Sequence, residues 1–393
     1  MQALLLVPVF LLVLACVLSM GNLLVLAVVV RILLCWYYKL NYNKKIFSSS
    51  IVRKSLCFMC MYLLLLLIPT IIMQGNLGEI GHYAERMLPF FLLLFVTDES
   101  IDIWSVLWLA VSVGLFIICL ATIPNLFLIS GRLHGCFGGA NSLGGILAVC
   151  MPLCYFGIYK FTENKKLVVF SSLLLLTAFM LMVFTQSRGS ALGWIASIVV
   201  FLVGIVVKHN WGRKKIFSYI TIVVLLLLAF SFVNKDMGLN FDRTIAKDGR
   251  VALLLAGGKM FVANPIMGVG VGNWMHQYDT IYGVANIEKH MESPHNIFLQ
   301  VLNEAGIVGL SGFLALLWFQ YDSLLKSFCA DLRSNTLKLQ WPFAILLTYI
   351  VTIVHGQVDY IFFQRGYQMF YWLLWGVYCW DFVYPKREGK TNC

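Results

Sequence analysis

Long uninterrupted apolar runs dominate this chain of 393 residues. A run of about 20 apolar residues can cross a bilayer as a helix, whereas strict alternation of apolar and polar residues would indicate strands. The runs therefore predict an all-α polytopic transmembrane helical bundle of about 12 spans, forming one integral membrane domain over residues 1–393. The expected spans cover residues 2–19, 22–38, 55–74, 80–97, 103–123, 142–159, 167–186, 190–207, 216–233, 297–321, 340–362 and 367–383.

The positions of the basic residues predict the orientation of these spans. The loops and tail on one side carry 18 Lys and Arg residues, against four on the other side outside the long loop 234–296, counting Arg86 in the outer part of the expected span 80–97. Short cytoplasmic loops are enriched in Lys and Arg, and long loops count little in this comparison. We therefore expect both termini to be cytoplasmic and the long loop, between the ninth and tenth spans, to face outward.

Composition excludes several classes of protein. With 60% hydrophobic and 12% charged residues and a mean hydropathy of +0.84, the chain is neither an ordinary soluble domain nor a disordered one. The net charge of +11 is explained by basic loops, so membrane lipid is the expected partner and nucleic acid is not. Cys57 and Cys60 form a CxxC motif without a second pair of cysteines. This favours their packing as small apolar side chains over a zinc site. No metal site and no cofactor are predicted.

Polar residues gather where the outward ends of the spans are expected. Arg132 lies in ISGRLHGCFGGANSLGG and Arg188 in FTQSRGSALGW, and either could also be a helix-end residue that extends toward the interface. Arginines flanked by glycines suit a phosphate-bearing head group, because the guanidinium forms paired hydrogen bonds with phosphate. The long loop and its end add Arg243, Arg250, Lys259, His276, His290 and His295.

His295 is the sharpest local signal, because it stands where the long loop meets the tenth span, in ESPHNIFLQVLNEAGIVGL. A neutral imidazole at this position can accept a proton from a hydroxyl, or it can orient the hydroxyl, and the sequence leaves both roles open. It also leaves open that His276 or His290 shares the role of His295. His355 and Asp359, four residues apart, form either a structural hydrogen-bonded pair or part of a site. The glycines of GVGVGNW, residues 268–274, lack a surrounding βαβ unit and indicate a tight turn rather than a nucleotide site.

In this order, the motifs resemble those of the O-antigen ligase and polymerase superfamily of bacterial envelope glycosyltransferases. An Arg, three residues and a Leu occur at 250–254, and a His, ten residues and a Gly at 295–306. NPIMGVGVGNW resembles the Pro…GlyxGly segment of the family, and Arg188 in TQSRG matches its outer-end arginine. The resemblance covers roughly residues 120–375 and is firmest over 185–310.

The resemblance implies a metal-independent ligase of the bacterial inner membrane, with its active site facing the periplasm and partly carried by the 234–296 loop. The enzyme would transfer a glycan from undecaprenyl diphosphate to a sugar hydroxyl of a glycolipid or glycan acceptor, such as lipid A–core. His295, Arg250 and Arg188 would be the catalytic residues, and Arg132, Lys259 and Asn296 would bind substrate. A polymerase of the same superfamily is the nearest alternative. A lipid-glycan flippase or transporter is a more distant one, since it predicts ionisable groups along a midplane path.

Overall fold

The computed structural model describes residues 2–38, 46–97, 101–127, 131–135, 137–209, 249–283 and 291–384, and these ranges contain helices and no strand. Three short turns are η1 (Ile46–Ser48), the π-helical η3 (Tyr278–Tyr282) and η4 (Ile361–Phe363). The α-helices are α1 (Gln2–Leu18), α2 (Gly21–Tyr38), α3 (Ser50–Ile72), α4 (Leu77–Arg86), α5 (Leu88–Val96), α6 (Ile103–Leu126), α7 (Ala140–Lys160), α8 (Lys165–Phe184), α9 (Arg188–His209), α11 (Gly249–Ala263), α12 (Trp274–Gln277), α13 (Ile297–Arg333), α14 (Pro342–Gly356) and α15 (Arg365–Val383).

Six of these helices, α3, α6, α7, α8, α9 and α13, are long and apolar enough to cross a membrane. Shorter apolar helices cover Leu6–Leu18, Gly21–Tyr37 and Pro342–Gly356. The prediction of an all-α protein with several membrane helices is confirmed. The total of 12 spans and the outward position of the 234–296 loop stay predictions, and the expected span 216–233 lies outside the described residues.

The expected span 80–97 is wrong as a single helix. Two helices, α4 and α5, meet at Met87, and Pro89 lies in the first turn of α5. Proline has no N–H to donate and its ring clashes with the preceding turn, so it begins a helix more readily than it continues one. With nine residues, α5 reaches only about 14 Å, less than the thickness of the hydrocarbon core.

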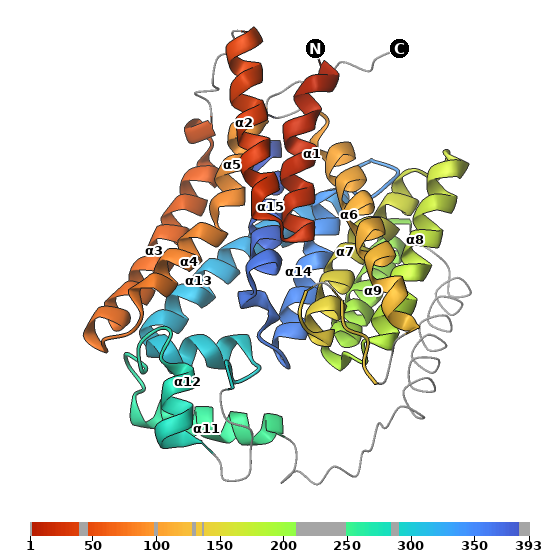
Figure 1. The fold of residues 1–393 in the computed structure, drawn as a ribbon. Helices are drawn as coiled ribbons and strands as arrows, with labels where there is room; N and C mark the ends of the chain where they lie inside the picture. Colours follow the sequence, from red (N-terminus) through yellow and green to blue (C-terminus); the bar gives the residue numbers. More distant parts are fainter. Residues whose placement is uncertain are drawn as a thin grey trace.

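The bundle has a buried centre and an exposed apolar rim. Helix α7 packs against α6, α8, α9 and α14. In its most apolar stretch of 18 residues, 89% of the residues are buried inside the protein, whereas the corresponding share is 33% in α3 and in α8. The exposed faces of the rim helices are apolar, as expected where lipid replaces water. In Figure 1, the start of α1 lies at one end of the molecule, and α11 and α12 lie at the opposite end, which we call the loop end.

Helix α13 is broken at Gly306, whose backbone has φ +62° and ψ −163°. The break leaves the carbonyl groups of Asn303 and Glu304 without their partners one turn onward. The glycine loop supplies replacements, because the N–H groups of Val269 and Gly270 donate to these two carbonyls at 2.8 Å each. Unpaired backbone groups at membrane depth are costly, so the loop and the broken helix stabilise each other.

The same exchange occurs on the other side of the break. The N–H groups of Ile307 and Val308 donate to the carbonyls of Pro265 and Ile266, at 2.9 and 3.3 Å. A side chain at Gly306 would prevent this, since its Cβ would lie 2.1 Å from the Ile266 carbonyl oxygen. The predicted turn at 268–274 is therefore a docked segment that completes the backbone hydrogen bonding of α13.

We predict that Gly306→Ala destabilises the protein by at least about 2 kcal/mol, through a left-handed backbone and a clash with the loop. The apparent midpoint of thermal unfolding of the purified protein would fall. Gly258→Ala in α11 is the matched control, because nothing lies within 4 Å of its Cβ position and alanine favours a helix. Equal midpoints for the two variants would contradict the role given to the break.

Candidate functional site

His295 is held immediately before α13 by a strongly constrained backbone. Its φ is +52°, a conformation that non-glycine residues rarely adopt and that the surroundings must enforce. Asn296 provides the constraint: its Oδ1 accepts hydrogen bonds from the N–H groups of Phe298 and Leu299, and its Nδ2 donates to the Gln357 carbonyl at 3.0 Å. The side chain of Asn296, predicted to bind substrate, therefore caps α13 and fastens its start to the segment that follows α14.

Asp359 is the partner of His295. Its Oδ1 lies 3.1 Å from Nδ1 of His295 and accepts the N–H of Tyr360 at 2.8 Å, while its Oδ2 accepts Nδ2 of Asn141 at 2.6 Å. Asp359 is 3% exposed and His295 keeps a partly exposed side chain. Burial by itself would raise the pKa of Asp359, but the hydrogen bond from His295, the nearby histidine charges and the Tyr360 N–H together lower it below its usual value.

This pairing sets the chemistry of the imidazole. An ionised Asp359 can only accept, so Nδ1 of a neutral His295 carries the proton and the lone pair is on Nε2. A histidine in this tautomer can take a proton from a hydroxyl at Nε2, while the carboxylate stabilises the resulting imidazolium.

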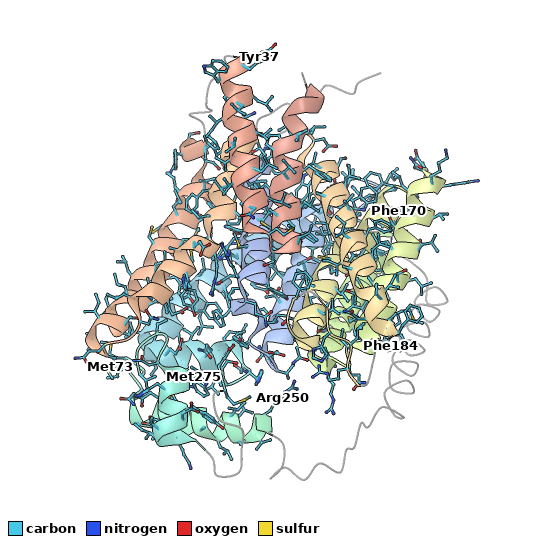
Figure 2. All side chains as sticks on the ribbon, viewed as in Figure 1. Tyr37, Met73, Phe170, Phe184, Arg250 and Met275 are labelled. Atoms are coloured by element: carbon cyan, nitrogen blue, oxygen red, sulfur yellow. The ribbon has the colours of Figure 1, made fainter. Side chains whose placement is uncertain are left out.

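Three arginines from separate segments share one electrostatic environment. Partial burial of the guanidinium lowers the pKa of Arg132, the charge of Arg250 lowers it further, Asp359 opposes this, and Arg188 adds to the lowering. Arg132 precedes α7, Arg188 begins α9, and Arg250 lies in the first turn of α11. Figure 2 shows Arg250 toward the loop end of the molecule, together with Met275, Met73 and Phe184. Tyr37 lies at the far end. Like charges gathered in this way favour an anionic ligand.

Hydrogen bonds connect Arg132, one arginine of this cluster, to His295. Nε of Arg132 donates to the Thr185 carbonyl at 2.9 Å, and its Nη2 donates to Oδ1 of Asn141. Asn141 donates in turn to Asp359, which pairs with His295. A continuous chain of polar groups therefore runs from a cation to a base, and it brings together α7, α13 and the segment after α14.

Other predicted residues lie elsewhere. Lys259 is exposed on α11, nine residues after Arg250, which places it about 13.5 Å along the helix axis and on the opposite face. His276 is exposed on α12. Arg243 and His290 lie outside the described residues.

The expected side-chain pair of His355 and Asp359 does not form. Helix α14 ends at Gly356, so the two residues do not share a helical face, and both ring nitrogens of the fully buried His355 lack a hydrogen-bond partner among the described residues. The ring packs instead against Gly189 and Gly145; a Cβ at Gly189 would lie 2.4 Å from its Cδ2. The small residue after Arg188 thus lets α9 approach α14 closely.

Asn141 and the pairing of Asp359 with His295 were not predicted from the sequence. Asn141 lies in the glycine-rich segment around Arg132, one residue before the predicted span 142–159, and nothing in the sequence marks it as a link. Asp359 was considered beside His355, four residues away, whereas its partner is 64 residues away in the chain.

The described fold and site define a polytopic helical membrane protein with a cation cluster connected to a His–Asp pair. Residues 173–314 match the family model described as O-antigen ligase, which supports a relationship between this part of the chain and the O-antigen ligase superfamily. The matched segment includes Arg188, Arg250 and His295, and it leaves out Arg132, Asn141 and Asp359. No curated protein matches the chain significantly.

We predict that the arginine cluster binds inorganic pyrophosphate. Pyrophosphate should raise the thermal midpoint of the purified protein, and Arg132→Gln should weaken this binding about ten-fold by removing one charge-assisted contact. Arg333→Gln, an exposed arginine at the end of α13, is the control and should leave binding unchanged. Equal weakening by both substitutions would show that the effect is one of net charge alone.

We predict that Asp359→Asn destabilises the protein by about 2 kcal/mol at neutral pH, because a buried charge-assisted network loses its carboxylate. Since the folded pKa of Asp359 lies below its unfolded value, this stabilisation is present at neutral pH and is lost as the pH falls through the ordinary Asp range, about 4, to the folded pKa. The gap between thermal midpoints of the wild type and the variant should therefore narrow below about pH 4.

Asp322→Asn serves as the control for Asp359→Asn. Asp322 pairs with Lys326 at 2.6 Å on an exposed face of α13, where an ion pair contributes at most about 1 kcal/mol. A gap for Asp359→Asn that is no larger than this, or that stays constant with pH, would contradict the ionised pair.

Proposed function

We propose that the protein is an O-antigen ligase-type glycosyltransferase of the bacterial inner membrane. It transfers a glycan from undecaprenyl diphosphate to a sugar hydroxyl of an acceptor such as lipid A–core, on the periplasmic face, without a metal or cofactor. The observation that carries this proposal is the polar chain from Arg132 through Asn141 and Asp359 to His295, within a protein that matches the O-antigen ligase family.

In the proposed reaction, Nε2 of His295 accepts the proton of the acceptor hydroxyl as its oxygen attacks the anomeric carbon of the donor glycan. The bond between that carbon and the diphosphate oxygen breaks, and its electron pair stays on the diphosphate. Arg132, Arg188 and Arg250 stabilise the negative charge that grows on this leaving group. The products are the glycosylated acceptor and undecaprenyl diphosphate, and the proton on His295 returns to solvent.

The division of roles follows from charge. Arginine suits a diphosphate because its planar fork donates two hydrogen bonds to phosphate oxygens. A neutral imidazole suits a hydroxyl because its pKa lies near physiological pH. Asp359 is a positioning residue in this scheme, since it touches His295 and not the reacting atoms.

The proposal is tested by the envelope glycolipids of a deletion strain that is complemented with the wild type, with His295→Ala or with His276→Ala. Lipid A–core and undecaprenyl-linked glycans would be resolved by gel electrophoresis and mass spectrometry. We expect the wild type and His276→Ala to restore capped core. His295→Ala should leave long polymers on undecaprenyl diphosphate and a bare core.

Other outcomes identify other functions. Core capped with single repeat units in the deletion strain would make the protein a polymerase. Lipid-linked repeats trapped on the cytoplasmic face would indicate a flippase. Full rescue by His295→Ala would overturn the mechanism, and failure of His276→Ala alone would move the proposed base to that histidine.

A further inference from the structure

A cavity of about 770 Å³ is lined by residues next to the His295–Asp359 pair, although His295 and Asp359 themselves are not part of its lining. Tyr360, the neighbour of Asp359, lines it; its ring centre lies 6.1 Å from that of His295, and its hydroxyl donates to Oε2 of Glu292 at 2.7 Å. Ser142, the neighbour of Asn141, lines the same cavity. Arg132, Arg188 and Arg250 do not line it, so the cavity and the arginine cluster are separate parts of the site.

The charges of the cavity differ from those of the arginine cluster. Carboxyl groups of Glu79, Glu292 and Glu304 line it, together with the guanidinium groups of Arg86 and Arg365. Both arginines already have acceptors in the protein: Nη1 of Arg86 donates to the Phe363 carbonyl at 2.8 Å, and Nη2 of Arg365 pairs with Glu85. The cavity therefore offers hydrogen-bond acceptors and no surplus of positive charge, which disfavours a polyanionic ligand.

Gln300 is a buried acceptor on the wall of this cavity. The residue is 6% exposed, and its Oε1 has no hydrogen-bond partner among the described residues. It lies one turn before Glu304, whose Oε1 accepts the Gly272 N–H at 3.0 Å. A buried carbonyl oxygen without a donor is unfavourable by about 1–3 kcal/mol, and a ligand hydroxyl would remove that cost.

Aromatic rings also line the cavity, and two of them are half-buried. Phe137 and Tyr360 contribute aromatic surface to the cavity, beside the carboxyl and amide acceptors. A sugar ring has C–H faces that pack on aromatic rings and hydroxyl edges that donate hydrogen bonds, so it meets both kinds of surface at once.

We propose that this cavity binds the acceptor saccharide, and that the sugar carrying the attacking hydroxyl is uncharged or an amino sugar rather than a phosphorylated or acidic one. This assignment rests on the proposed glycosyl transfer. Two ligands of different charge would then meet at His295. An anionic diphosphate would bind at the arginine cluster, and a hydroxyl-rich sugar would bind in a cavity where carboxyl groups outnumber guanidinium groups. Gln300 and Glu304 are the residues expected to receive hydroxyl hydrogen bonds.

The test measures the two ligands separately on the purified full-length protein. Native mass spectrometry would follow undecaprenyl diphosphate, and saturation-transfer NMR would follow tri-N-acetylchitotriose, which is neutral, and trigalacturonic acid, which is anionic. The variants are Gln300→Leu, Glu304→Gln and Arg132→Gln, with Glu163→Gln, an exposed glutamate on the loop between α7 and α8, as the matched control.

We expect Gln300→Leu and Glu304→Gln to weaken neutral trisaccharide binding about ten-fold and to leave undecaprenyl diphosphate binding within about two-fold. Arg132→Gln should do the reverse, and Glu163→Gln should change neither. Trigalacturonic acid should bind the wild type at least about ten-fold more weakly than the neutral trisaccharide, because it meets like charge in the cavity.

Several results would overturn the assignment. One is binding of trigalacturonic acid to the wild type that is as tight as that of the neutral trisaccharide, or tighter. Another is no binding of the neutral trisaccharide to the wild type. The third is loss of undecaprenyl diphosphate binding in Gln300→Leu but not in Arg132→Gln. Failure of the wild type to bind undecaprenyl diphosphate would instead refute the proposed function, while the trisaccharide measurements would still judge the cavity. Thermal midpoints of each variant would identify any that fails to fold.

Discussion

The exchange of backbone hydrogen bonds at Gly306 is the constraint on which the rest of the loop end depends. A helix that breaks between apolar neighbours must find new partners for its freed carbonyl and N–H groups, because lipid offers none. Residues 265–270 provide four such bonds, two on each side of the break. The loop that carries α11 is thereby attached to α13, and the start of α11 is where Arg250 lies.

A second set of contacts turns this scaffold into a site. Asn296 caps α13 and also holds the Gln357 carbonyl, so the residue before it and the segment after α14 are kept in register. His295 and Asp359 meet across that junction, and Asn141 approaches from the first turn of α7. The candidate functional groups thus come from helix ends, where free backbone groups and polar side chains are normal, while the apolar middles of the helices fill the core.

The sequence predicted the parts of this arrangement that depend on local patterns. Most helices match apolar runs within a few residues, and Arg188, Arg250 and His295 were found from motifs that the family match includes. Pro89 could have indicated the break between α4 and α5, but the segment was predicted as one span, and Asn296 was predicted to bind substrate rather than to cap α13. Lys259 could have been separated from Arg250 by helical periodicity alone.

What the sequence could not provide were the pairings set by packing between helices. The contact between Asn141 and Asp359 joins residues 218 apart, and it requires α7 and α14 to approach each other at their ends. His355 illustrates the same limit, because its spacing from Asp359 suggested a pair that the end of α14 at Gly356 prevents. Spacing along one element predicts neighbours only while that element continues.

The wall of the cavity draws on both the early and the late helices of the described chain. The cavity is lined by Val17, Leu18 and Ser19, at and just after the end of α1, and by residues 363–367 around the start of α15, and these two helices pack together. During synthesis α1 enters the membrane long before α15 is made, since translation adds only about 5–20 residues per second. The pocket is therefore among the last features to form during biogenesis. Ribosome-bound intermediates that already contain His295 still lack residues 363–367, so the cavity cannot be enclosed until the last helix of the described chain has been made.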